Sequence, residues 1–201
     1  MLLQLAVITP SLTKIPPTTN IDNAMTVGLS DHGRHLALHA AGRLEQLLGP
    51  RTVDLVVCAP AVSCTQTGMI AGQKPEEEIE YAPELGYEHS RYARLLHGMV
   101  AKHGYEPYRN YEKEVQALPD NFGENAWKSL CDTIADHRSH VALAICYPVI
   151  LQAMLMQVAH GKYTKEVREL VLAPCEGALI NFDDHGGVRN MYPFCIEPAR
   201  A

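Results

Sequence analysis

The sequence of 201 residues lacks several features that would assign it to a functional class. No apolar run approaches the length at which a helix crosses a membrane. The formal net charge is −6 with neutral histidines, so neither nucleic acid nor an anionic membrane is an expected partner. The N-terminus shows no basic segment followed by a small-residue cleavage site, which a secretory signal peptide would need. These absences favour a cytoplasmic protein.

Metal-binding and redox patterns are missing as well. The six cysteines form no CxxC pair, and four of them lie beside or within apolar patterns, where a buried free thiol is the ordinary role. His35 and His39 are four residues apart, as two zinc ligands on a helix can be, but the sequence places no third ligand. We expect no metal and no cofactor.

What the sequence does contain is a recurring unit of apolar strand, proline and helix. Each of three apolar runs is followed within two residues by a proline, and a helical pattern comes later in each unit. Near-continuous apolar runs are typical of strands buried on both faces in a parallel sheet. The carboxyl ends of such strands meet at one edge, which is where ligands bind in open α/β sheets. The three runs are residues 2–8, 53–58 and 141–146.

Helix and hairpin signals complete the predicted fold. Ser30 is placed to cap a helix whose apolar residues recur at helical spacing until Gly49. Turn residues at 183–187 predict a hairpin near the C-terminus. The expected C-terminal strands are residues 169–173, 178–182 and 188–192.

Together these elements predict an α/β fold with three layers, an α/β/α sandwich. Its sheet is expected to be mostly parallel, with an antiparallel strand supplied by the C-terminal hairpin. We expect residues 1–201 to form a single domain, with an insertion or lid at about residues 87–123.

Five segments together resemble the histidine phosphatase superfamily, the phosphoglycerate mutase-like proteins. In chain order, that family has a first strand running into Arg-His-Gly-Glu, a helix introduced by Leu-Thr-x-x-Gly-Arg, a segment Ser-Ser-Pro-x-x-Arg-x-x-Gln-Thr, a late strand ending in Ser-His-Gly, and a final hairpin. The corresponding segments here are residues 8–11 (ITPS), 28–34 (GLSDHGR), 58–67 (CAPAVSCTQT), 146–148 (CYP) and 181–187 (NFDDHGG). The resemblance covers nearly the whole chain and implies a phosphoglycerate mutase-like fold.

The residues that perform the chemistry of this family are replaced. By position, Thr9 stands where the family has its nucleophilic histidine, and Ile8 stands where it has the neighbouring arginine. Ser63 replaces the second arginine, and Tyr147 replaces the second histidine. Of this set, an acid after the third strand is retained as Glu84.

The resemblance also indicates which positions should line one cleft at the carboxyl edge of the sheet. A phosphohistidine mechanism needs an imidazole nucleophile, cationic donors and an acid for the leaving group, and these positions supply neither the imidazole nor the cations. We therefore expect no catalytic residue, and these positions are binding residues only. They are Thr9, Ser11, Ser63, Glu84, Cys146 and Tyr147.

The function that follows is that of a pseudoenzyme, which has lost phosphatase and mutase catalysis and serves as a binding or regulatory protein. Its expected partner is a protein or a small neutral ligand. The chain could also form a homodimer.

Two alternatives remain at this point. One is a phosphatase or phosphotransferase that does not use phosphohistidine, with a site rebuilt around Glu84, Tyr147, Cys146 or Thr9. This alternative would gain support if basic residues converged on the cleft, and the candidates are Lys14, Arg91 and Arg94. The other is a thiol-based sensor that uses Cys58 and Cys146, because both cysteines end apolar strands.

Overall fold

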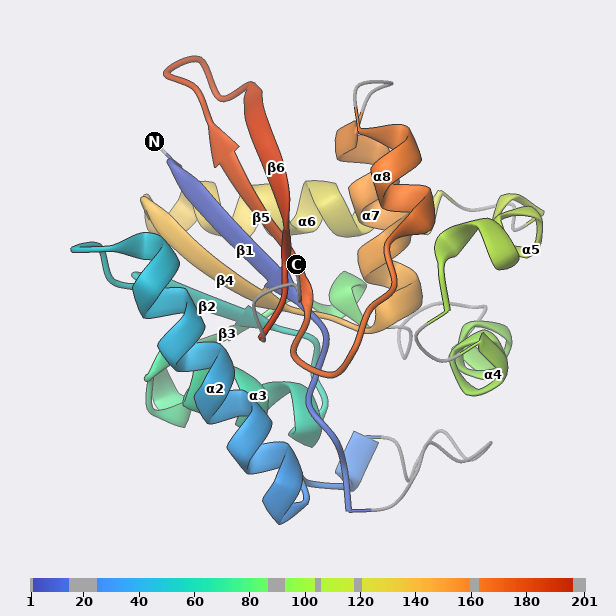
Figure 1. Ribbon diagram of the computed structural model, residues 1–201, viewed down its shortest axis with the longest axis horizontal. Helices are drawn as coiled ribbons and strands as arrows, with labels where there is room; N and C mark the ends of the chain where they lie inside the picture. The colour runs from blue at the N-terminus through green and yellow to red at the C-terminus, as the bar shows by residue number, and fades with distance from the viewer. Residues whose placement is uncertain are drawn as a thin grey trace, which may run out of the picture.

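Six strands form one mixed sheet at the centre of the molecule (Figure 1). The computed structural model describes residues 2–14, 25–86, 93–103, 106–117, 121–159 and 163–196. The strand order across the sheet is β3-β2-β4-β1-β5-β6. The strands are β1 (Gln4–Ile8), β2 (Leu55–Cys58), β3 (Ile79–Tyr81), β4 (Val141–Ile145), β5 (Gly177–Phe182) and β6 (Val188–Phe194).

The first four strands run parallel to one another, and the last two run antiparallel to their neighbours. β4 pairs in parallel with both β1 and β2, and β2 pairs in parallel with β3. β5 is antiparallel to β1 and to β6. The predicted mostly parallel sheet with an antiparallel C-terminal hairpin is therefore confirmed.

The central strands are buried because helices cover both faces of the sheet. Every residue of β2 and β4 is buried, as is every residue of β1 after Gln4. Ile8 at the end of β1 lies opposite Ile145 of β4 and Gly177 of β5. A Cβ atom at Gly177 would lie 1.9 Å from the carbonyl oxygen of Val7, so this close approach of two backbones requires glycine.

Helices α2 (Asp31–Leu48) and α3 (Val62–Gly72) pack together on one face of the sheet (Figure 1). The hydroxyl of Ser30 accepts a hydrogen bond from the backbone N–H of Gly33, which caps the start of α2. Gly49 ends this helix with φ of 64°, a left-handed conformation that favours glycine. Both boundaries were predicted from the sequence and are confirmed.

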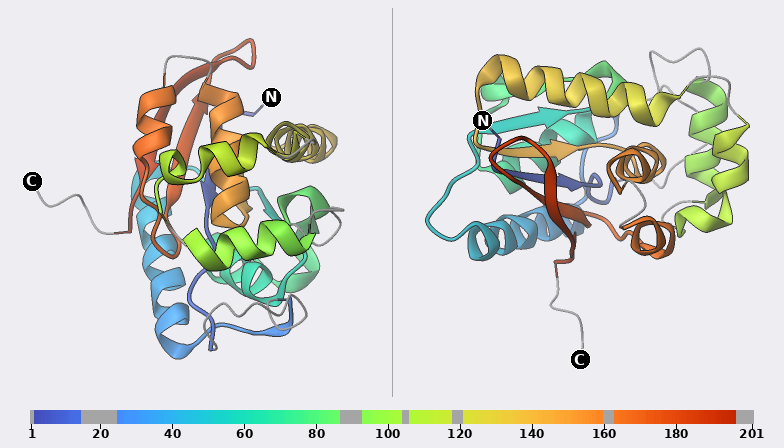
Figure 2. Two further views of the ribbon diagram at one scale, coloured as in Figure 1. Left: turned by 90° about the vertical axis from the view of Figure 1, so that its right-hand side faces the viewer. Right: turned by 90° about the horizontal axis from the view of Figure 1, so that it is seen from above.

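Helices α6 (Phe122–His137) and α7 (Pro148–Ala159) cover the other face, as the view from above in Figure 2 shows for α6. α7 starts at Pro148, where a missing N–H is tolerated because the first helical N–H has no partner within the helix. No helix in the described ranges has both the length and the apolar composition needed to span a membrane.

Smaller elements lie beside α7, within the segment expected to be an insertion. They are α4 (Ala93–His103), the short helix η3 (Tyr108–Asn110) and α5 (Glu112–Gln116), while residues 87–92, 104–105 and 118–120 of this segment lie outside the described ranges. Tyr108 and Tyr111 are buried and pack edge to face, with ring centroids 5.4 Å apart. Arg168 of α8 (Thr164–Glu169) donates to Glu112 of α5 over 2.7 Å, and this ion pair fastens α5 to α8.

One predicted strand is wrong. Residues 169–173 do not join the sheet, because Glu169 ends α8 and residues 170–173 pair with no described strand. Side chains bind its backbone instead. The side-chain amide of Gln152 donates to the Leu170 carbonyl over 2.9 Å, and the Ala173 N–H donates to the Glu176 carboxylate over 3.1 Å. An apolar run whose backbone is satisfied by side chains has the same sequence pattern as a strand.

Candidate functional site

The carboxyl ends of β1, β2 and β4 meet at one edge of the sheet, as the strand pattern predicted. The pairing continues one residue beyond the strands at this edge. The Cys146 N–H donates to the Ile8 carbonyl over 3.1 Å, and the Ala59 N–H donates to the Ile145 carbonyl over 3.0 Å. The residues that follow β1 and β4, among them Thr9 and Cys146, therefore lie side by side.

Thr9 is fully buried and hydrogen-bonded on two sides. Its hydroxyl donates to the Ala173 carbonyl over 2.8 Å, and its N–H donates to the Glu176 carbonyl over 2.9 Å. Both partners belong to the segment just before β5. The Thr9 hydroxyl and N–H thus hold this segment against the end of β1.

Ser11 and Ser63 are also buried, and Thr67 of α3 connects them. The Ser11 N–H donates to the Thr67 hydroxyl over 3.0 Å, and this hydroxyl donates in turn to the Ser63 carbonyl over 2.7 Å. The Ser11 hydroxyl donates to the Gly33 carbonyl in the first turn of α2 over 2.7 Å. These bonds join the end of β1 to the first turns of α2 and α3 without any charged group.

Cys58, Cys64 and Cys146 form a buried group of thiols at the same edge. Burial raises the pKa of Cys58, and the neighbouring Cys146 raises it further. Burial likewise raises the pKa of Cys146, with Cys64 as the neighbour that adds to the effect. All three side chains are inaccessible, and the Cys58 thiol donates to the Cys64 carbonyl over 3.4 Å. Buried thiols with raised pKa values are poor nucleophiles at neutral pH.

Tyr147 and Glu84 have different surroundings. Tyr147 follows Cys146 and is 6% exposed, and its carbonyl accepts the Leu151 N–H at the start of α7 over 2.8 Å. Glu84 lies in the short helix η2 (Pro83–Leu85) and is exposed, and its carboxylate accepts a hydrogen bond from Ser129 of α6 over 2.8 Å. The Glu84 carboxylate is therefore bound at the surface by a residue of α6.

Of the predicted site residues, the structure places five at the carboxyl edge as buried residues and Glu84 at the surface. Three basic residues were considered as support for a rebuilt site. Lys14 and Arg94 are exposed, and Arg91 lies outside the described ranges. The part of the chain that is described holds no group of three or more histidine, cysteine or acidic side chains arranged for a metal ion.

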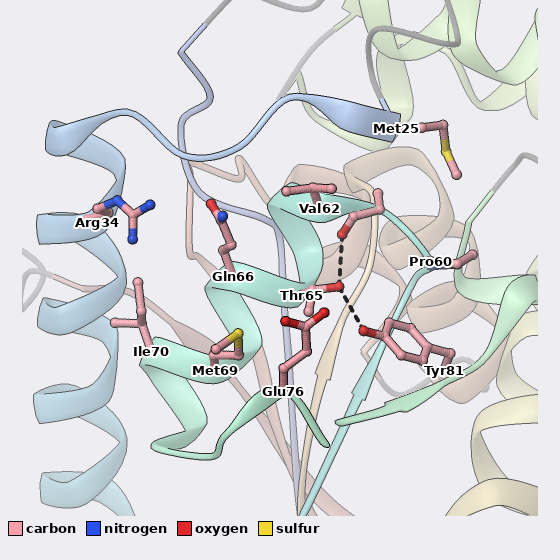
Figure 3. Close-up of a pocket in the computed structure, with 11 residues that line it drawn as sticks. Met25, Arg34, Pro60, Val62, Thr65, Gln66, Met69, Ile70, Glu76 and Tyr81 are labelled. Atoms are coloured by element: carbon pink, nitrogen blue, oxygen red, sulfur yellow. Dashed lines mark hydrogen bonds between the residues drawn. The ribbon is translucent and has the colours of Figure 1, made fainter. Parts of the chain in front are cut away.

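A pocket of about 480 Å³ lies on the outer face of α3 and was not predicted from the sequence (Figure 3). Arg34 of α2 reaches toward it from one side, and Tyr81 at the end of β3 lies on the other side. None of the six predicted positions lines it. One signal for this pocket was present in the sequence: α3 has apolar residues at positions 62, 69 and 70, on the side where a surface helix is normally polar.

No family model matches the sequence, and no curated protein matches it. Solved structures do match its fold over nearly the full length of both chains. The structure of the protein histidine phosphatase SixA complexed with tungstate aligns with a TM-score of 0.60 at 12% identity, covering 96% of this chain and 97% of that one.

Two further structures show the same likeness. The alpha-ribazole phosphatase from Shigella flexneri aligns with a TM-score of 0.56 at 14% identity, covering 90% of this chain and 92% of that one. The phosphoserine phosphatase from Entamoeba histolytica, in complex with 3-phosphoglyceric acid, aligns with a TM-score of 0.59 at 13% identity, covering 94% of this chain and 95% of that one. The chain therefore has the same fold as these solved phosphatase structures. At these identities, the histidine phosphatase fold is what the chain shares with its neighbours, and activity has to be argued from the site.

Proposed function

We propose that this protein is a non-catalytic relative of the histidine phosphatases that serves as a binding or regulatory protein in the cytoplasm. The observation that carries the proposal is the hydrogen bond from the Thr9 hydroxyl to the Ala173 carbonyl. At the position of the family's nucleophile, the side chain is fully buried and its proton is held by a backbone carbonyl.

The electrostatics of the edge support the same proposal. Phosphoryl transfer is catalysed mainly by positioning and by positive charge around the phosphoryl oxygens. Ile8 and Ser63 stand where the family has arginines, and both are buried without charge. The polar groups around them are already hydrogen-bonded within the protein. The Ser11 N–H donates to the Thr67 hydroxyl, which donates to the Ser63 carbonyl. An edge of this kind provides little positive charge and few unpaired hydrogen-bond donors for a phosphate dianion.

The expected partner is a protein or a small ligand without net charge, because the neutral edge gives no attraction for an anion. A phosphatase with a rebuilt site finds less support. Its candidate acid, Glu84, is bound by Ser129 at the surface, and burial raises the pKa of its candidate thiol, Cys146.

Turnover of p-nitrophenyl phosphate and phosphoserine tests the proposal, with wild type and Thr9→Val purified in parallel. We expect no hydrolysis above the level of the variant. Removing a catalytic nucleophile costs about 10⁶ in turnover in a well-studied protease, so a shared residual rate would identify a contaminant. Saturable wild-type turnover that disappears in Thr9→Val would overturn the proposal.

A further inference from the structure

The smallest residues of α3 fix how this helix sits on the sheet. A Cβ atom at Gly68 would lie 2.6 Å from Sγ of Cys58, and a Cβ atom at Gly72 would lie 2.4 Å from Cγ2 of Val56. Neither position has room for a larger side chain. The glycine face of α3 is therefore held against β2, and the opposite face of the helix is turned outward.

This outward face is apolar. Val62, Met69 and Ile70 lie on it together, because residues seven and eight positions apart return to the same side of a helix. Val62 is 38% exposed, and the other two are partly exposed. They line the pocket of about 480 Å³, which falls within the roughly 300–1,000 Å³ typical of small-molecule sites.

Val62, Met69 and Ile70 form the apolar floor of the pocket. The polar groups around this floor are held in place by neighbouring elements. The Thr65 hydroxyl is hydrogen-bonded to the Tyr81 hydroxyl over 3.3 Å, and Tyr81 is 44% exposed at the end of β3. The side-chain carbonyl of Gln66 accepts the Leu29 N–H over 2.8 Å, which ties α3 to the chain before α2. The pocket thus has a fixed polar wall on each side of its apolar floor.

Two opposite charges border the pocket. Arg34 extends from the first turns of α2, and Glu76 extends from the short helix η1 (Glu76–Glu78) at another side (Figure 3). Within the ranges that the structure describes, neither side chain takes part in an ion pair or hydrogen bond. Glu78 of the same short helix, in contrast, pairs with Lys74 over 3.0 Å.

We infer that this pocket binds a small amphipathic zwitterion, a molecule with an anionic group, an apolar body and a cationic group. Arg34 meets the anionic group, Glu76 meets the cationic group, and the apolar body lies on Met69 and Ile70. Such a ligand has no net charge. The inference rests on the proposed binding role, and it gives that role a site and a ligand class.

The series 5-aminopentanoate, 6-aminohexanoate and 8-aminooctanoate provides the probes, because it varies the spacing of the two charges. Calorimetry measures affinity, and amide shifts of the ¹⁵N-labelled protein locate the site. We expect saturable binding of at least one member, with shifts concentrated in residues 62–70. Arg34→Gln and Glu76→Gln should each weaken binding roughly tenfold, the effect of losing one charge-assisted hydrogen bond.

Matched controls separate this pairing from general charge effects. Glu77→Gln removes an adjacent exposed charge that does not line the pocket, and Arg189→Gln removes an exposed arginine on β6. Both variants should bind as wild type does, and hexanoate and hexylamine should bind roughly tenfold more weakly than 6-aminohexanoate. No saturable binding by any member, equal binding of the singly charged compounds, or binding unaffected by Arg34→Gln and Glu76→Gln would overturn the inference.

Phosphatase turnover measured on the same samples keeps the two proposals apart. Zwitterion binding by an inactive protein supports both. An inactive protein without such binding overturns the pocket inference alone, and turnover lost in Thr9→Val overturns the non-catalytic role even where the pocket binds.

Discussion

Thr9 and Ala173 are joined by a hydrogen bond of 2.8 Å from the threonine hydroxyl to the alanine carbonyl. The bond links the end of β1 to the segment before β5 at the carboxyl edge of the sheet. Thr9 is fully buried there, and the same carbonyl also accepts the Glu176 N–H over 3.0 Å. The position therefore has a structural role, and its neighbours are arranged around a small side chain.

Substitutions at Thr9 should change stability and not activity. Thr9→Val keeps the shape and removes the donor, and we expect a loss of about 1 kcal/mol in the free energy of unfolding. Thr9→His also places a larger imidazole side chain in this buried position, which should raise the loss of unfolding free energy to about 2–4 kcal/mol. Urea unfolding measures both, and a phosphohistidine assay checks the His variant. A His variant as stable as wild type that takes up a phosphoryl group would contradict this account.

Tyr147→His should fold and remain inactive. Pro148 still begins α7, and the carbonyl of residue 147 still accepts the Leu151 N–H, because both features belong to the backbone. Replacing the phenol of this buried residue by a smaller imidazole should cost about 1–3 kcal/mol. Circular dichroism and a melting curve establish folding, and turnover of p-nitrophenyl phosphate establishes activity. Measurable turnover in this variant would mean that the rest of the site is intact.

Thiol labelling should leave the cysteines at the sheet edge untouched. Cys58, Cys64 and Cys146 are fully buried, whereas Cys131 and Cys195 are partly exposed. Burial raises the pKa of Cys131 to about 11, so even its labelling should be slow at neutral pH and faster as the pH rises. Iodoacetamide labelling of the native protein, read by peptide mass spectrometry, should modify only the partly exposed thiols. Label on Cys58 or Cys146 under native conditions would favour the thiol sensor.

The hairpin between β5 and β6 should lose stability in acid. The Gly187 and His185 N–H groups donate to the Asp183 carboxylate over 2.8 and 2.9 Å, and these bonds hold its pKa below the ordinary value of 3.8. A lowered pKa stabilises the fold above the unfolded value, and this contribution disappears as the pH falls through the folded value. Asp183→Asn should therefore destabilise the protein at pH 7 and by less at pH 3.

Urea unfolding at the two pH values measures the difference between wild type and Asp183→Asn. Asp184→Asn is the matched control, since it removes the next charge along the same turn. A penalty for Asp183→Asn that is the same at both pH values would show that the carboxylate charge plays no part.

The fold could be predicted because local signals agreed with one another. The apolar runs, the Ser30 cap and the Gly49 stop each marked an element that the structure contains. The strand expected at residues 169–173 failed, since an apolar stretch does not reveal whether its backbone pairs with a strand or with side chains such as Gln152 and Glu176.

The site was harder to predict because side-chain direction and partner are set by tertiary packing. Thr9 directly follows an apolar run in the sequence and Cys146 ends one, which was enough to predict that both lie at the carboxyl edge of the sheet. Sequence alone gave no sign that Glu84 would be bound by Ser129 of α6. The pocket beside α3 depends on Arg34 and Glu76, which are far apart in the sequence and come together only in the folded chain.

Calorimetric titration with vanadate tests the central claim most directly, because this anion needs positive charge and the buried residues described at the edge are uncharged. Under the proposed function, the edge lacks two charge-assisted donors that a phosphatase of this fold would use, and each is ordinarily worth about 1.5–3 kcal/mol. Losing both should weaken binding by roughly a hundredfold or more, at about 1.4 kcal/mol per factor of ten. We expect no saturable heat at vanadate concentrations up to about a millimolar. Saturable binding in this range that Tyr147→Phe abolishes would contradict the account.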